Sequence, residues 1–302
     1  MRMQHWIMLI VLSVLWGAGF IFSKQSLTAI APLTLTLARC AIAAAVLLAA
    51  MWALGYQLPT TARERRDFAV MALLNNVIPF SLIFLGQTMI PSGLAAVANS
   101  TTPLMTLLVA RILAGEKLSR NKLAGVALGI VGVAELVGAS ALVGDRASVL
   151  GMLLVAGGAL SYGFSGLWGR RFKQTPPIVT SAMQLSCSTL ILLPLASWHD
   201  RFWLQPLPSA EIVGCVLALG IISTALAYIL FFRIMAEAGS NNAMLVTLLI
   251  PVTAIAFGAM IFGEALLPHQ LAGAAIIAAS LLIIDGRLFG IGPAPGVLQH
   301  KL

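Results

Sequence analysis

Two groups of residues in this chain combine paired polar side chains with an aromatic ring inside otherwise apolar stretches. They are Asn75, Asn76 and Phe80 and, 148 residues later, Ser223, Thr224 and Tyr228. Amides and hydroxyls supply uncharged hydrogen-bond partners, and an aromatic ring supplies an apolar wall. In hydrocarbon, such polar groups are tolerated where they face protein or a water-filled cavity. The pattern therefore predicts a cavity suited to an amphipathic, net-neutral solute.

Other residues of the same kinds extend this candidate cavity. The candidate substrate-binding residues are Trp16, Phe20, Asn75, Asn76, Phe80, Phe84, Asn99, Tyr162, Ser223, Thr224, Tyr228 and Thr247. For any one of them alone, helix packing or lipid contact is the simpler interpretation. Their recurrence at matched places favours a cavity. Prolines bend helices by removing a backbone hydrogen bond, so Pro79, Pro103 and Pro251 are candidate hinges.

Two charged residues fall inside apolar stretches. Arg39 and Glu135 lie about seven and eight residues from the same end of their spans, which is roughly 10 Å deep at 1.5 Å per residue. Equal depth predicts an ion pair that fixes two helices. The alternatives are that Arg39 receives a substrate carboxylate or that Glu135 carries a coupling proton.

Membrane-spanning helices must carry these residues. Of the 302 residues, 60% are hydrophobic and 9% are charged, whereas a soluble domain is about 25% charged. A helix needs about 20 apolar residues to cross a bilayer. Breaks in the apolar signal give ten spans, at 6–23, 33–54, 68–85, 93–113, 123–143, 149–168, 178–198, 212–235, 243–262 and 270–284.

The basic residues divide unevenly between the two sides that ten spans define. Those on the side of the amino terminus are Arg2, Arg63, Arg65, Arg66, Arg111, Lys117, Arg120, Lys122, Arg170, Arg171, Lys173, Arg233, Arg287 and Lys301. Only Lys24, Arg146 and Arg201 fall on the opposite side. Because short cytoplasmic loops are rich in Lys and Arg, we expect a multi-pass protein with both termini in the cytoplasm.

A block of sequence recurs after 148 residues. The matches are Pro103 with Pro251, Gly115-Glu116 with Gly263-Glu264, and Leu123-Ala124-Gly125 with Leu271-Ala272-Gly273. Each half then holds five spans, and an odd number of spans inverts the second half in the membrane. We expect a first repeat at 1–143, an inverted second repeat at 144–289 and a cytoplasmic tail at 290–302. Inverted repeats are typical of secondary transporters that bind substrate near the midplane.

Glu116 and Glu264 occupy matching positions in this block, on opposite sides of the membrane. A residue present on both sides is a poor sensor of one compartment. We expect each glutamate to tie a short turn through backbone hydrogen bonds, with a direct role in transport as the alternative.

The doubled block, together with Trp16-Gly17-Ala18-Gly19-Phe20 and Arg39, resembles the drug/metabolite transporter superfamily, EamA type. The resemblance covers nearly the whole chain and is greatest to the YddG-type amino-acid exporters. It implies a carrier in the bacterial inner membrane that exports amino acids or related metabolites, aromatic and other neutral ones in the YddG type. The second half differs by having Tyr162-Gly163 in place of Trp16-Gly17 and Gln184 near the place of Arg39, which leaves the substrate open.

Several classes of protein are disfavoured by what the sequence lacks. It has no phosphate-binding loop for ATP, and its ten acidic residues are scattered rather than clustered. The three cysteines have no paired spacing, and the +8 charge lies in short loops. We expect no enzyme, cofactor, metal or nucleic-acid partner; a channel is a weaker alternative to a carrier. The expected partners are a small-molecule substrate and the bilayer.

The fifth span also carries a face of small residues, Gly125 and Gly129. Small residues at this interval let two helices approach closely. We expect this face to pack within one chain and the protein to be a monomer, with a dimer interface as the alternative.

Overall fold

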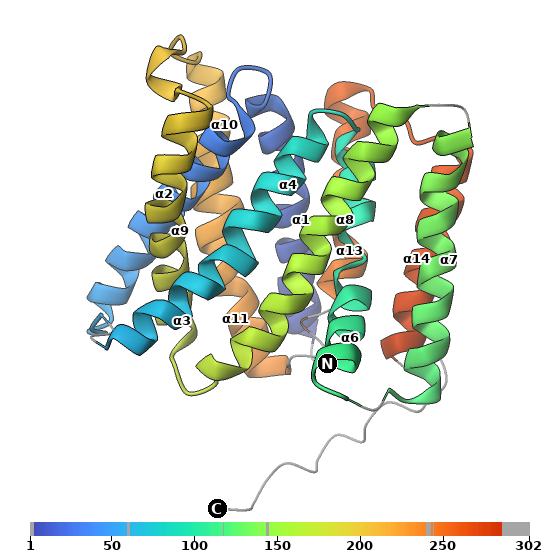
Figure 1. Ribbon diagram of the computed structural model, residues 1–302, viewed down its shortest axis with the longest axis horizontal. Helices are drawn as coiled ribbons and strands as arrows, with labels where there is room; N and C mark the ends of the chain where they lie inside the picture. The colour runs from blue at the N-terminus through green and yellow to red at the C-terminus, as the bar shows by residue number, and fades with distance from the viewer. Residues whose placement is uncertain are drawn as a thin grey trace, which may run out of the picture.

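The computed structural model describes residues 3–58, 61–116, 118–142, 145–239, 243 and 245–285, and these form a bundle of helices (Figure 1). The first half contains α1 (Met3–Ser26), α2 (Pro32–Ala53), α3 (Ala62–Ala72), η1 (Leu73–Val77), α4 (Ile78–Gln87), α5 (Ser92–Asn99), α6 (Thr102–Leu113) and α7 (Arg120–Leu142). The second contains α8 (Arg146–Trp168), η2 (Gly169–Phe172), α9 (Pro177–His199), η3 (Phe202–Leu204), α10 (Ala210–Gly220), η4 (Ile221–Leu226), α11 (Ala227–Ala238), α13 (Val246–Phe262) and α14 (Pro268–Asp285). The predicted tail at 290–302 lies outside the described residues.

Each of the ten predicted spans corresponds to one helical segment of the described chain. The third, fourth and eighth spans are composite, built from α3–η1–α4, α5–α6 and α10–η4–α11. By length and composition, seven segments can cross a membrane, and α13 and most of α14 form shorter apolar helices. The 23-residue α7 completes the set. The all-helical, multi-pass membrane fold is confirmed.

The two halves of the bundle run in opposite directions. We call the end where α1 begins the N side and the opposite end the far side. Helix α1 starts on the N side, whereas α8, its counterpart, starts on the far side (Figure 1). Helix α2 packs against its counterpart α9 and α7 against α14, while the contact of α1 with α13 is matched by that of α8 with α6. These are two inverted five-helix repeats.

The repeated Gly-Glu pair has a conformational basis. Gly115 and Gly263 both adopt a left-handed backbone, with φ of 64° and 65°, which glycine tolerates without a steric penalty. The following glutamate then donates its backbone N–H to the carbonyl six residues earlier, at 3.3 Å in the first repeat and 3.1 Å in the second. The same helix-ending motif therefore closes α6 and α13.

The third helix of each repeat contains a π-helical turn that the sequence did not predict. The turns η1 and η4 begin 148 residues apart, at Leu73 and Ile221. They hold the predicted polar pairs, so Asn75 and Ser223 lie at equivalent places in the two halves. Such turns insert one extra residue into a helix and occur frequently at functional sites.

The three candidate hinge prolines differ in their effects. Pro103 follows a two-residue turn between α5 and α6, and the hydroxyls of Ser100, Thr101 and Thr102 each donate at 2.7 Å to a carbonyl three residues earlier. Pro79 stands in the first turn of α4, directly after η1. Pro251 lies inside the unbroken α13. The helix is thus interrupted just before Pro103 and continuous through Pro251.

The small-residue face of α7 is covered within the chain. A Cβ on Gly125 would meet Ile284 and the carbonyl of Ser280, and one on Gly129 would meet Leu104. This confirms the packing interpretation of that face, which leaves no space there for a second copy.

Candidate functional site

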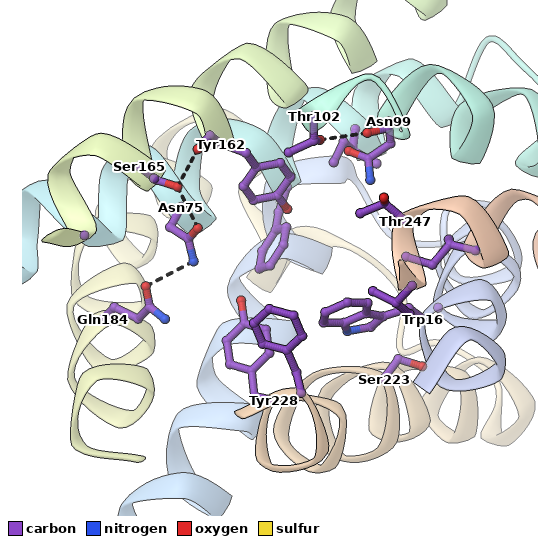
Figure 2. Close-up of a pocket in the computed structure, with 18 of the residues that line it drawn as sticks. Trp16, Asn75, Asn99, Thr102, Tyr162, Ser165, Gln184, Ser223, Tyr228 and Thr247 are labelled. Atoms are coloured by element: carbon purple, nitrogen blue, oxygen red, sulfur yellow. Dashed lines mark hydrogen bonds between the residues drawn. The ribbon is translucent and has the colours of Figure 1, made fainter. Parts of the chain in front are cut away.

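A cavity of about 630 Å³ lies between the two repeats (Figure 2). This is within the usual size range of small-molecule sites, roughly 300–1,000 Å³. Ten of the twelve candidate substrate-binding residues line it, namely Trp16, Phe20, Asn75, Phe80, Phe84, Asn99, Tyr162, Ser223, Tyr228 and Thr247. They come from both halves of the chain, so the cavity depends on the repeats being packed together.

Asn76 and Thr224, the other two, stand behind the cavity wall. The Nδ2 of Asn76 donates to Ser188 Oγ at 3.0 Å, and its Oδ1 accepts from the hydroxyl of Tyr228 at 3.4 Å. Thr224 is fully buried, and its hydroxyl donates to the Leu219 carbonyl at 2.8 Å. Asn76 therefore supports the lining side chain of Tyr228, and Thr224 supports that of Arg39.

Aromatic rings form much of the apolar wall. The rings of Trp16 and Phe231 have centroids 5.4 Å apart, and those of Phe80 and Phe84 are stacked at 6.5 Å. Tyr228 in turn meets Phe232 edge to face at 6.2 Å. Rings in such arrangements hold one another in fixed orientations and add to the energy of burial. The wall is therefore suited to the apolar body of a solute.

The expected ion pair between Arg39 and Glu135 is wrong. Arg39 lines the cavity, donates from Nε to Thr224 Oγ1 at 2.9 Å, and stacks its guanidinium 3.7 Å above the centroid of the Phe80 ring. Glu135 is exposed on α7 and does not line the cavity. Equal depth does not make two side chains meet when their helices face different parts of the bundle.

A polar network joins the two repeats across one side of the cavity (Figure 2). Asn75 donates from Nδ2 to Gln184 Oε1 at 3.1 Å, and its Oδ1 accepts from Ser165 Oγ at 2.9 Å. Both ends of the Asn75 amide are thus satisfied by residues of the second repeat. Gln184 lies near the place that corresponds to Arg39, so this part of the lining is uncharged where its counterpart is cationic.

Two buried polar atoms next to the cavity have no hydrogen-bond partner among the described residues. They are the side-chain oxygens of Asn99 and Ser223, and both residues contribute to the lining. Most buried polar atoms in proteins are paired, so an unpaired one calls for a physical reason. Because both residues line the cavity, their oxygens are candidates for pairing with a polar solute.

A clasp of polar contacts closes the cavity at the far side. Ser23 Oγ donates to Gln87 Oε1 at 2.7 Å, and Gln87 Nε2 donates to the Phe20 carbonyl at 2.9 Å. Lys24 Nζ adds bonds to the carbonyls of Gln87 and Ile90 at 2.7 and 3.0 Å. Ser23 and Gln87 are buried.

The opposite end of the cavity reaches the surface of the N side. Its lining there includes Phe172 and Lys173, which follow α8, and Lys173 is exposed. The cavity is therefore closed at one end of the bundle and reaches the surface at the other.

Several lining residues were not predicted, among them Gln87, Ser165, Gln184 and Phe231. Gln87 and Gln184 carried a usable signal, because an uncharged polar residue inside an apolar span tends to face protein or a cavity. Phe231 carried none, since apolar rings also face lipid. Within the described residues, no three His, Cys, Asp or Glu side chains gather where they could hold a metal ion.

The model of the EamA-like transporter family matches this chain twice, at residues 4–138 and 149–285. The chain belongs to the EamA-like transporter family. It is 24% identical to the uncharacterized transporter YoaV of Bacillus subtilis, over 91% of this chain and 94% of that protein. It is 27% identical to the uncharacterized inner membrane transporter YedA of Escherichia coli K12, over 92% and 90% of the two chains.

A further relative has a more specific name, and a solved structure has the same fold. The chain is 28% identical to the probable amino-acid metabolite efflux pump of Salmonella typhimurium, over 89% of this chain and 91% of that protein. A crystal structure with 21% sequence identity superimposes with a TM-score of 0.65, covering 95% of this chain and 99% of that one. Membership of the EamA-like family thus makes this chain a membrane transporter.

Proposed function

We propose that this chain is a secondary transporter that exports neutral and aromatic amino acids and related metabolites across a bacterial inner membrane by alternating access, in the manner of the YddG-type exporters. The observation that carries the proposal is the cavity between two inverted repeats, lined by aromatic rings and uncharged polar groups and closed at one end. Two similar halves can pack in two alternative ways around such a site. The name of the Salmonella relative supports amino-acid metabolites as the substrate class.

The orientation of the chain is part of this proposal. Basic residues such as Arg65, Arg120 and Arg170 belong to N-side helix ends, and the excess of Lys and Arg there supports a cytoplasmic N side. The cavity would then open inward, ready to load a cytoplasmic solute.

The orientation is tested by cysteine labelling. A cysteine introduced at exposed Lys173 should react with a membrane-impermeant maleimide only from the cytoplasm. A cysteine at exposed Thr28, on the far side, should react only from outside, and the reverse pattern would contradict the orientation.

Transport is tested with purified protein in liposomes preloaded with unlabelled L-phenylalanine or L-leucine. A carrier should accumulate the labelled amino acid faster when the same amino acid is present on the opposite side, whereas a channel should show no such stimulation. A pH jump imposed on the same vesicles tests for proton coupling. If no neutral amino acid shows saturable uptake, the amino-acid assignment is wrong. The better assignment is then a permease for drugs or for unrelated metabolites.

The role of the cavity is tested in the same vesicles. Trp16→Ala and Tyr228→Ala should each reduce the initial rate of exchange by roughly tenfold or more, because a buried aromatic contact is worth about 1.5–3 kcal/mol. Trp203→Ala is a matched control, since Trp203 is exposed in η3 away from the cavity. Equal exchange rates in all three variants would show that the substrate does not bind in this cavity.

A further inference from the structure

Arg39 is a cation in a cavity wall that contains no acid. The chain has ten acidic residues, and none of the cavity-lining residues is one of them. Among the described residues, no carboxylate lies within ion-pair distance of Arg39. Charged side chains within membrane spans are expensive and are usually paired. The positive charge of Arg39 is therefore uncompensated by the described protein.

The contacts of Arg39 hold its guanidinium in one orientation while leaving part of it unused. Its Nε donates to Thr224 Oγ1 at 2.9 Å, and its Cζ lies 3.7 Å from the centroid of the Phe80 ring. Thr224 is itself fixed by its bond to the Leu219 carbonyl. No described residue accepts a hydrogen bond from either terminal nitrogen, Nη1 or Nη2. These are the donors that a guanidinium fork uses to bind a carboxylate through two parallel hydrogen bonds.

We propose that Arg39 is the residue that determines specificity, by binding the carboxylate of the substrate, and that the carrier selects solutes by this carboxylate rather than by an amino group. This inference rests on the proposed function and narrows it. The surrounding aromatic wall accommodates the apolar body, and the guanidinium of Arg39 in that wall accommodates a single negative charge. The substrate class is thus monocarboxylates with an apolar or aromatic side chain, which includes neutral amino acids.

The same electrostatics exclude other ligand classes. A cationic drug would place its charge beside Arg39 with no acidic residue in the lining to offset the repulsion. A phosphate ester carries up to two negative charges, and the next cation in the lining, Lys173, is exposed at the N-side mouth. The geometry therefore distinguishes an exporter of amino acids from a permease for organic cations that has the same fold.

The first test uses the unmodified full chain in detergent and three probes with the same aromatic body. L-Phenylalanine carries both charges, 3-phenylpropionate only the carboxylate and phenethylamine only the ammonium group. Binding is measured by titration calorimetry. We expect 3-phenylpropionate to bind within about tenfold of L-phenylalanine, and phenethylamine to bind at least tenfold more weakly than either, because a hydrogen bond to a charged group contributes roughly 1.5–3 kcal/mol, or about 10- to 150-fold.

The second test changes the residue. Arg39→Gln should weaken both acids by roughly tenfold or more and leave phenethylamine unchanged or improved, while Arg39→Lys should retain part of the preference for acids because it keeps the charge but loses the planar fork. Arg171→Gln is the matched control: Arg171 also stacks on an aromatic ring, 3.6 Å from the centroid of Trp168, but is exposed outside the cavity. A purely structural role for Arg39 would weaken all three probes equally.

The outcomes separate this inference from the function on which it rests. If phenethylamine binds as well as L-phenylalanine, or if Arg39→Gln affects acids and amine alike, the carboxylate role is wrong while an amino-acid carrier stands. If none of the three probes binds and no neutral amino acid is exchanged in liposomes, the proposed function is wrong and the inference fails with it. The inference is supported if the unmodified chain binds both acids more tightly than the amine and Arg39→Gln loses this preference.

Discussion

The carboxylate of Glu264, in the second repeat, caps the first turn of α5, in the first repeat. Its two oxygens accept hydrogen bonds from the backbone N–H of Ser92 at 3.0 and 2.8 Å, and a weaker one comes from Gly93 at 3.4 Å. A negative group at a helix N-terminus satisfies unpaired backbone donors and interacts favourably with the helix dipole. The turn at Gly263 thus places Glu264 so that it joins the two halves on the far side, where the cavity is closed.

The equivalent glutamate on the N side has a different partner. Glu116 pairs with Arg170, and both side chains are substantially exposed. The expectation that each glutamate ties a short interhelical turn through backbone hydrogen bonds is therefore confirmed for the side chain of Glu264, which binds the start of α5 after the α4–α5 turn, and wrong for that of Glu116. Glu264 binds backbone groups of the other repeat, and the side chain of Glu116 binds a cation. The two ends of the bundle are held by contacts of unequal strength.

Glu264→Gln should destabilise the protein by about 1–2 kcal/mol, because the neutral amide presents one acceptor oxygen in place of a carboxylate to the donors of α5. Thermal unfolding in detergent measures the effect. Glu116→Gln is the natural control and should change stability by less than about 1 kcal/mol, as exposed ion pairs contribute little. Equal losses of stability in the two variants would show that the cap on α5 contributes no more than the exposed ion pair of Glu116.

Gly17→Ala should also destabilise the chain, here by overpacking. A Cβ at Gly17 would overlap the hydroxyl oxygen of Thr253 on α13, and that hydroxyl already donates to the Ser13 carbonyl at 2.8 Å. Overpacking of this kind costs about 1–3 kcal/mol. Gly214→Ala, in open space on α10, should be neutral or slightly stabilising, since alanine favours the helix. A melting temperature unchanged by Gly17→Ala would contradict the close approach of α1 and α13.

The bond between Asn75 and Gln184 should appear as an energetic coupling between the repeats. We expect the double variant of Asn75→Ala and Gln184→Leu to lose less stability than the sum of the single variants, by about 1 kcal/mol, because each single variant already removes the bond between the two amides. A cycle of Asn75→Ala with Gln205→Leu, at a glutamine near η3 on the far side, should show additivity. Additivity in both cycles would contradict the contact between Asn75 and Gln184.

The sequence predicted the fold well because its determinants are local. The length of apolar runs sets the spans, and an odd number of spans in each half requires inversion, whatever the tertiary contacts are. The π turns at η1 and η4 could not be read in this way, since a single extra residue in a helix leaves the hydrophobic pattern almost unchanged. The polar pairs marked their positions without indicating their backbone conformation.

The site was predicted by residue type and only partly by arrangement. Polar and aromatic residues at matched places identified most of the lining, because hydrocarbon tolerates them mainly where they face a cavity. The direction in which each side chain points around its helix was not accessible from sequence. For this reason Asn76 and Thr224 were placed in the lining rather than behind it, and Arg39 was paired with Glu135 on depth alone.

The far-side clasp should control which side of the membrane reaches the cavity. Gln87→Leu removes the acceptor of Ser23 and the donor to the Phe20 carbonyl, so the closed far side should lose stability relative to an open one. In a background with the three native cysteines replaced, Phe84→Cys in the cavity wall should react with impermeant maleimide only from the N side. Adding Gln87→Leu should produce labelling from the far side as well.

The control for this experiment is a second glutamine at the same end of the bundle. Gln25 Nε2 donates to Glu211 Oε1 at 3.0 Å in an exposed contact that takes no part in the clasp. Gln25→Leu should therefore leave labelling of Phe84→Cys confined to the N side. Because a shift between two packings needs only a few kcal/mol, loss of one buried and one partly buried hydrogen bond is enough to populate the second packing measurably. Labelling restricted to the N side in the Gln87→Leu background would show that other contacts keep the far side closed.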